Sequence, residues 1–110
     1  MNTLRNMPVD HAERMAGMIE VRPHQVVSMG LAKSEHVQMT LFAFAKGESV
    51  SEEAYFGDTL YYNLEGTIWI DMDGKSIELV PGEVLRVPEG VLHAVRGKDD
   101  FKMLQITVAD

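Results

Sequence analysis

The chain has 110 residues, enough for one domain with a modest hydrophobic core. It contains no cysteine, which excludes disulfide bonds and thiolate metal sites. Its formal net charge of -7 argues against a nucleic-acid partner, because binding phosphates requires clustered Lys and Arg. No apolar run approaches the ~20 residues of a membrane span, and no signal-peptide pattern opens the chain, so we expect a cytoplasmic protein without membrane partners.

The first residues differ from those that follow. Residues 6–16 can form a short helical turn, which Gly17 ends early. We therefore divide the chain into an N-terminal arm over residues 1–20 and a barrel domain over residues 21–110. The arm is expected either to cover the barrel or to reach a partner subunit.

Beyond the arm, short runs of apolar and β-branched residues alternate with turn signals, which predicts strands. The expected strands cover residues 26–31, 37–45, 59–64, 67–72, 76–80, 84–87, 92–96 and 101–108, with a short, acidic and irregular segment over residues 50–56. Asp73-Gly74 predicts a tight hairpin, because a type I′ turn needs positive φ at two successive residues. About nine short strands at regular spacing indicate an all-β sandwich or barrel.

The strand over residues 37–45 is apolar on both faces. Met39 and Leu41 lie on one face, whereas Phe42 and Phe44 lie on the other. A strand of this kind must be covered on both sides, and a subunit contact is one way to cover it. We therefore expect a homodimer formed through an exposed sheet face.

A pattern of turns near the C-terminal end carries a family resemblance. Gly82 is followed after five residues by Pro88 and Gly90, with one residue between them, and then after two residues by His93. This spacing resembles the second sequence motif of the cupin superfamily, in which Gly97 here stands where the motif has its final Asn.

The first cupin motif is matched at its two ends, by Gly47 and Gly66. The resemblance covers roughly residues 24–108, which is most of the chain. It implies a small single-domain conserved-barrel cupin, an all-β protein folded as a double-stranded β-helix or jelly-roll barrel.

The resemblance also implies a place for a metal. The two histidine positions of the first motif fall on Glu53 and Tyr55, and its glutamate position falls on Thr59, one residue after Asp58. The histidine of the second motif is His93. Glu53, Asp58 and His93 could hold one divalent metal, and such oxygen-rich ligation favours Mn, Fe, Zn or Ni.

The sequence leaves open which side chains of the strand after residue 58 face the inside of the barrel. Strand side chains alternate, so Asp58 and Thr59 cannot both face inward without a kink. If Thr59 faces inward, Tyr61 and Asn63 do so as well and, together with Tyr55, form a polar ligand pocket. If Asp58 faces inward, the wall is drier and carries one carboxylate. In a simpler interpretation Asp58 caps a turn.

Three functions are compatible with these residues. The leading hypothesis is a protein that binds a small-molecule ligand in the barrel through a divalent metal held by Glu53, Asp58 and His93. The alternative is a metal-free binding or sensing module, in which His93, Tyr61 and Asn63 bind an organic anion or a sugar-like ligand by hydrogen bonds. In the simplest interpretation Glu53 belongs to a solvated acidic loop. A structural dimer with a vestigial pocket is the third. The residues do not decide between an enzyme and a binding protein.

Overall fold

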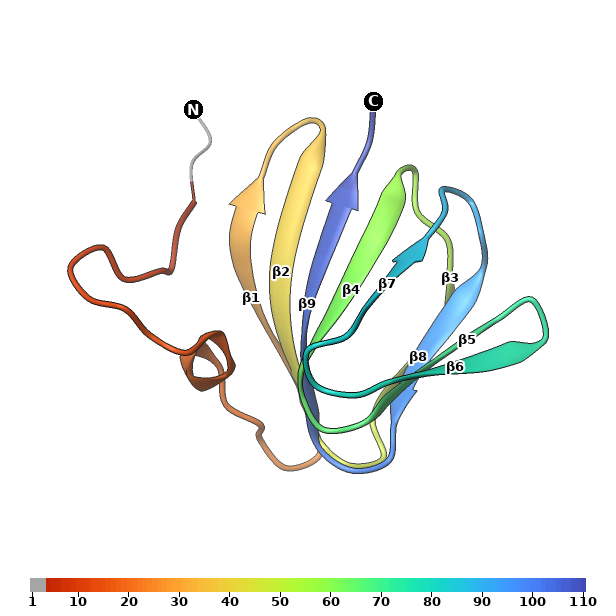
Figure 1. Ribbon diagram of the computed structural model, residues 1–110, viewed down its shortest axis with the longest axis horizontal. Coiled ribbons are helices and arrows are strands. Elements are labelled where there is room, and N and C mark those ends of the chain that lie inside the picture. Colours follow the sequence, from red (N-terminus) through yellow and green to blue (C-terminus); the bar gives the residue numbers. More distant parts are fainter. Residues whose placement is uncertain (1–3) are drawn as a thin grey trace.

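The computed structural model describes residues 4–110, which form nine strands and one short helical turn. The strands are β1 (Val26–Lys33), β2 (Val37–Phe44), β3 (Ser49–Glu53), β4 (Asp58–Glu65), β5 (Ile68–Met72), β6 (Lys75–Leu79), β7 (Val84–Val87), β8 (His93–Gly97) and β9 (Phe101–Val108). A large sheet has the order β1-β2-β9-β4-β7 and a small sheet the order β3-β8-β5-β6, with antiparallel pairing throughout (Figure 1). The prediction of an all-β jelly-roll barrel is confirmed.

The tight turns lie where the sequence places them. Asp73 and Gly74 have φ of 52° and 73°, as a type I′ hairpin between β5 and β6 requires. Gly82 and Gly90 also have positive φ, of 94° and 78°. Glycine adopts this conformation at little cost, so these local residues determine where β6, β7 and β8 begin and end.

The main hydrophobic core lies between the two sheets. Phe44 and Phe101 are cross-strand partners on β2 and β9, and their rings stack with centroids 4.4 Å apart. Around them the core contains Tyr61, Ile68, Ile70, Leu79, Val87, Val95 and Met103. The stacked pair closes the barrel beside Gly97, at the opposite end of β8 from His93, and Tyr61 extends the core as far as His93.

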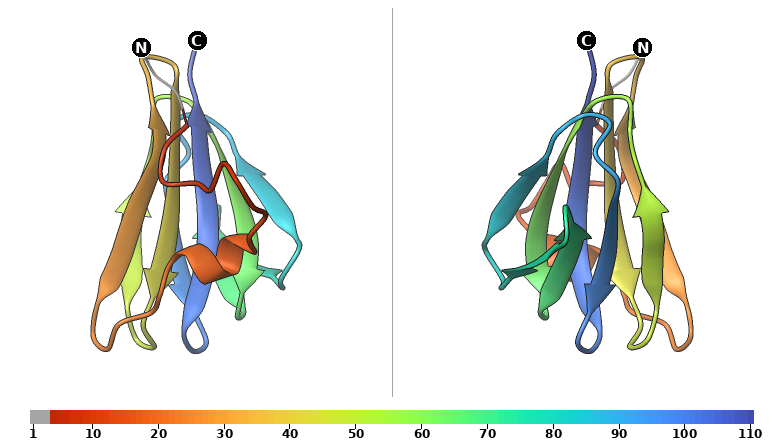
Figure 2. Two further views of the ribbon diagram at one scale, coloured as in Figure 1. Left: turned by 90° about the vertical axis from the view of Figure 1, so that its left-hand side faces the viewer. Right: turned by 90° about the vertical axis from the view of Figure 1, so that its right-hand side faces the viewer.

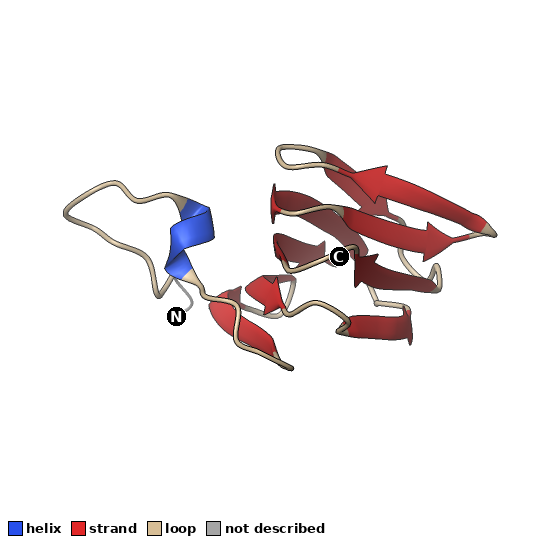
Figure 3. Cartoon of the chain, turned by 90° about the horizontal axis from the view of Figure 1, so that it is seen from below, coloured by secondary structure: helices blue, strands red, loops and turns tan. Residues whose placement is uncertain are grey.

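The N-terminal arm covers the outer face of the large sheet (Figure 2). It contains the only helix in residues 4–110, a 3-10 turn named η1 (Met15–Met18), which stands beside an otherwise all-strand fold in Figure 3. Ile19 directly after η1 is 5% exposed and packs into a second apolar cluster on the sheet. The ammonium group of Lys102 on β9 donates a hydrogen bond of 2.7 Å to the carbonyl of Ala16. The arm therefore covers the barrel, which is one of the two roles expected for it.

The arm explains why β2 is apolar on both faces. Phe44 packs between the sheets, whereas Leu41 and Ala43 belong to the cluster that contacts the arm. The second apolar face is therefore covered within one chain and does not by itself require a subunit contact. The homodimer stays a prediction. No helix of the described residues is long and apolar enough to cross a membrane.

Candidate functional site

His93 is buried at the start of β8, with 2% of its surface exposed. The turn at Gly90 directs the chain into this strand. The Gly90 N–H also donates a hydrogen bond of 3.0 Å to the carbonyl of Tyr55, in the connection between β3 and β4. One turn therefore positions both His93 and Tyr55.

Both ring nitrogens of His93 have hydrogen-bond partners. Nδ1 lies 2.9 Å from the carbonyl oxygen of Val91, and Nε2 lies 2.7 Å from the hydroxyl oxygen of Tyr61. A carbonyl oxygen only accepts, so Nδ1 carries the proton. In the neutral ring Nε2 is then the acceptor, and the Tyr61 hydroxyl donates to it. The lone pair that would bind a metal is engaged by this phenol.

Tyr61 is suited to act as a donor because it remains protonated. Burial raises the pKa of its hydroxyl above the usual value of 10.0, and the neighbouring Tyr55 and the charge of Glu53 raise it further. The phenol is therefore neutral at physiological pH and can donate its proton to His93.

Glu53 and Tyr55 complete this group. Glu53 is the cross-strand partner of His93 on β3 and β8, so both side chains lie on the same face of the small sheet. The centroid of the Tyr55 ring lies 5.8 Å from that of the His93 ring, and the Tyr61 ring lies 5.5 Å away. The structure thus brings together four of the residues singled out in the sequence, on the inner side of the barrel.

Asp58 does not join them, which corrects the expected metal-ligand set. Thr59 faces inward with 1% of its surface exposed, so Asp58 points to the outer face of β4. There Oδ1 accepts a hydrogen bond of 2.9 Å from the Glu89 N–H, and Oδ2 lies 3.5 Å from the guanidinium of Arg86. Asp58 therefore caps, from outside, the turn that leads to His93.

Asn63 faces inward as expected for one of the two alternatives, but its amide is fully used by the backbone. Nδ2 donates to the carbonyls of Gly66 at 2.8 Å and Leu79 at 2.7 Å, and Oδ1 accepts from the Glu65 N–H at 2.8 Å. These bonds hold β4 to the start of β5 and the end of β6. Both polar atoms of the Asn63 amide thus have backbone partners, which gives this side chain a structural role.

A cavity of about 140 Å³ lies inside the barrel next to this group. Its lining residues are Gln38, Thr40, Phe42, Tyr55, Gln105 and Thr107. All the polar ones among them are uncharged. Thr59 extends the polar wall, since its hydroxyl lies 3.1 Å from that of Thr107. A second hollow of about 180 Å³ at the barrel mouth shares Tyr55 with the cavity and includes the 94% exposed Phe56.

Four of the polar residues that line the cavity were not identified from the sequence. Gln38 and Thr40 lie on β2 and pair with Thr107 and Gln105 on β9, so the register places these side chains next to one another. The sequence does contain an indication of this wall. Polar residues alternate with apolar ones at the beginning of β2, at Gln38 and Thr40, and near the end of β9, at Gln105 and Thr107. Without the pairing of these distant strands, nothing connected the two.

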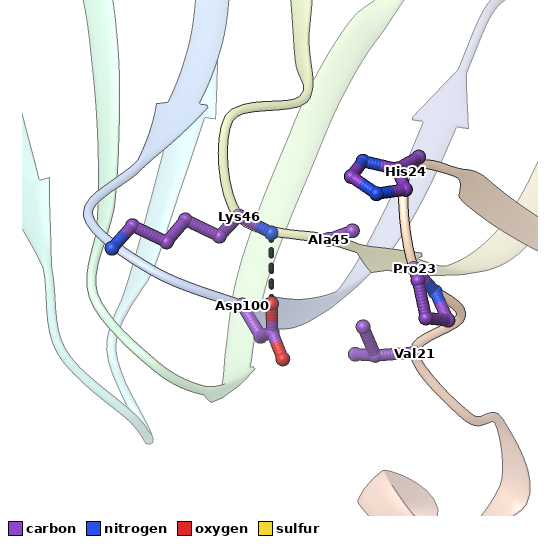
Figure 4. A pocket seen from close by; sticks show the side chains of 6 residues that line it. All are labelled: Val21, Pro23, His24, Ala45, Lys46 and Asp100. Atoms are coloured by element: carbon purple, nitrogen blue, oxygen red, sulfur yellow. Dashed lines mark hydrogen bonds between the residues drawn. The ribbon is translucent and has the colours of Figure 1, made fainter.

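A more open hollow of about 300 Å³ lies at the other end of β2 (Figure 4). It is lined by Val21, Pro23, His24, Ala45, Lys46 and Asp100. The Lys46 N–H donates a hydrogen bond of 2.8 Å to the Asp100 carboxylate, and the Lys46 side chain extends away from His24. None of the residues predicted for the site lines this hollow, whereas Glu53, Tyr55 and Tyr61 lie around His93.

Comparison with known proteins identifies the family. The sequence model of the cupin domain matches residues 40–108. The chain is 54% identical to a cupin superfamily protein from Desulfitobacterium hafniense DCB-2, whose crystal structure matches it with a TM-score of 0.95 over 98% of this chain and 99% of that chain. The chain belongs to the cupin superfamily.

Two other structures resemble this cupin. A cupin 2 conserved barrel domain protein from Leptotrichia buccalis is 34% identical with a TM-score of 0.82, over 86% of this chain and 46% of that chain. A conserved protein of unknown function from Streptococcus pyogenes is 22% identical and shares the fold, with a TM-score of 0.94 over 100% of this chain and 96% of that chain. No protein of curated function matches the sequence.

The residues at the metal positions of this cupin do not fit a divalent metal. Within residues 4–110, no three His, Asp or Glu side chains converge as a ligand group. The one imidazole at these positions, that of His93, has both nitrogens engaged. Tyr61 takes the place of a metal as the partner of Nε2.

The departure at the last position of the second motif has a steric reason. A β-carbon at Gly97 would collide with the ring of Phe101, which stacks on Phe44. The Asn of the motif cannot be accommodated against this aromatic pair. Packing of the core therefore accounts for the glycine at this position.

Proposed function

We propose that this cupin binds a small polar organic molecule inside the barrel by hydrogen bonds and without a metal. The observation that carries the proposal is the engagement of both nitrogens of His93, beside a cavity whose polar lining groups are all uncharged. Hydrogen bonds from Tyr61 and to Val91 hold the imidazole in place next to Tyr55, which lines the cavity.

The cavity sets the size and chemistry of the ligand. Its volume of about 140 Å³ corresponds to roughly five water molecules, at ~30 Å³ for each. Gln38 and Gln105 offer donors and acceptors, whereas Phe42 offers an apolar face. A compact molecule with several hydroxyl or amide groups matches this lining.

The proposal is tested by measuring binding to protein treated with a chelator and checked for metal by elemental analysis. A panel of small polyols and amides is titrated and followed by NMR. Gln105→Leu, which keeps the side-chain volume and removes the amide, should weaken binding of the best ligand at least about tenfold, corresponding to roughly 1.4 kcal/mol. Gln25→Leu, the same change on an exposed residue outside the cavity, should leave binding unchanged.

Binding that disappears with the metal and returns with its addition would contradict the proposal. Equal effects of the two glutamine variants would contradict it as well, because the ligand would then lie outside the barrel.

The homodimer expected from the sequence is tested separately. Leu60, Tyr62 and Val84 stay exposed on the outer face of β4 and β7. Sedimentation of the wild-type protein and of Leu60→Asp measures the oligomeric state. A dimer that Leu60→Asp dissociates would support a contact through this face, and a monomeric wild type would contradict the expectation.

A further inference from the structure

We infer that the ligand of the barrel cavity is a small organic cation, a compound that carries an ammonium group together with hydroxyl or amide groups. The inference rests on the proposed function and adds the charge of the ligand. It combines three features: the absence of cationic side chains from the cavity wall, a carboxylate that shares the inner face of the small sheet with His93, and aromatic rings in the cavity and at its mouth.

No side chain that could neutralise an anion lines the cavity, as far as residues 4–110 are concerned. The six lining residues are uncharged, and the adjoining hollow at the mouth contains Glu35 and His36 but no Lys or Arg. An anion inside the barrel would lose its hydration without gaining an ionic partner, which is costly. The overall charge of -7 also disfavours the approach of an anion and favours that of a cation.

Glu53 supplies the opposite charge. It shares the inner face of the small sheet with its cross-strand partner His93, and its negative charge reaches the hydroxyl of Tyr61. Its side chain is exposed, and within the described part of the chain it forms no ion pair. The carboxylate is therefore free to pair with an ammonium group bound beside Tyr55, the cavity residue whose ring lies 5.8 Å from that of His93.

Aromatic rings line both hollows. Tyr55 belongs to the cavity and to the mouth, Phe42 lies in the cavity, and Phe56 lies at the mouth with most of its surface exposed. The negative faces of such rings attract cations. A carboxylate beside aromatic rings and uncharged hydrogen-bonding groups is an environment that an amine fits better than an acid of the same size.

Three molecules of nearly equal size test the effect of ligand charge. At neutral pH serinol is a cation, glycerol is neutral and glycerate is an anion. Their dissociation constants for the wild-type protein are measured by NMR titration at neutral pH and low salt. We expect serinol to bind about three- to tenfold more tightly than glycerol, and glycerate to bind most weakly. The preference for serinol should shrink as ionic strength rises.

The variant Glu53→Gln tests whether the carboxylate of Glu53 causes the preference for the cationic ligand. It should reduce the preference for serinol over glycerol to within about twofold. Glu52→Gln is the matched control, because Glu52 lines a different hollow with Asp71 and Lys75 and should not change the preference.

Equal binding of serinol and glycerol, or tighter binding of glycerate, overturns the inference and leaves the metal-free site in place. A preference for serinol that survives Glu53→Gln also overturns it. If none of the three molecules binds, the inference fails, and the proposed function is then judged by its own panel of ligands and the Gln105→Leu variant.

Discussion

The two faces of the large sheet show how the same strands serve two purposes. On the outer face, Leu41 and Leu104 of β2 and β9 are buried under the arm in a continuous apolar cluster. On the inner face, near the barrel mouth, these strands carry Gln38 and Gln105, which line a cavity. Adjacent residues of one strand therefore face either a covered apolar layer or a polar hollow.

The difference separates stability from binding. Burying apolar surface stabilises a fold by roughly 25 cal/mol per Å², so the outer face and the closed end of the barrel hold the chain together. The amides and hydroxyls that line the cavity near the mouth bury no apolar surface and do not contribute this stabilisation. Substitutions on the two kinds of surface should consequently affect different measurements.

The largest effect is expected at the closed end of the inner face. Phe44→Ala removes a fully buried ring that stacks on Phe101 and should lower the free energy of unfolding by about 3–5 kcal/mol. Urea denaturation measures it. Phe56→Ala, the same change at the exposed mouth, should alter it by less than about 0.5 kcal/mol. Similar losses in both variants would show that the core is not where we place it.

The next largest loss of stability is expected where the arm packs on the large sheet. Ile19→Ala leaves a cavity between the arm and the sheet and should lower the free energy of unfolding by roughly 2–4 kcal/mol. Val9 is 99% exposed in the same arm, so Val9→Ala should change stability by less than about 0.5 kcal/mol. An Ile19→Ala protein as stable as the control would mean that the arm does not dock on its own barrel in solution.

Tyr61→Phe should have an intermediate effect that depends on pH. It leaves Nε2 of His93 buried without its donor, which should lower the free energy of unfolding by about 1–3 kcal/mol at neutral pH. The pKa of Tyr61 is raised in the folded protein, so the unfolded chain loses the phenolic proton first. The stability this group contributes is fully present below pH 10.0 and declines as the pH rises above it.

Urea denaturation between pH 7 and 11 compares the two proteins. The wild type should lose up to ~1.4 kcal/mol more per pH unit above pH 10 than Tyr61→Phe, which lacks the titrating group. Parallel alkaline declines would contradict a buried, neutral Tyr61.

The smallest effect on stability is expected at the cavity wall. The side-chain amide of Gln105 faces the cavity and forms no hydrogen bond with another described residue, so Gln105→Leu should leave the free energy of unfolding unchanged or raise it by up to about 1 kcal/mol. The same variant should lose ligand binding, as proposed above. A marked destabilisation would indicate that the amide supports the fold instead of a ligand.

Residues that act through local geometry were predictable. Asp73-Gly74 was assigned to its hairpin because only certain residues tolerate positive φ in succession. The spacing from Gly82 through Gly90 to His93 carries the family resemblance, which implied a jelly roll with an inward histidine, and the structure has both. The cover of the second apolar face was less predictable, because a sequence pattern shows that a face is buried and not by what.

The sequence by itself determined the turns, the position of His93 and every strand except β3, which lies where an irregular segment was expected, since each of these features depends on neighbours in the chain. Only the tertiary structure decided between Asp58 and Thr59, because a shift of one residue in the pairing of β4 with β9 exchanges its faces. The same pairing of distant strands gave His93 the phenol of Tyr61 as its partner. A turn is specified within a few residues, whereas a site is specified by register across the sheet.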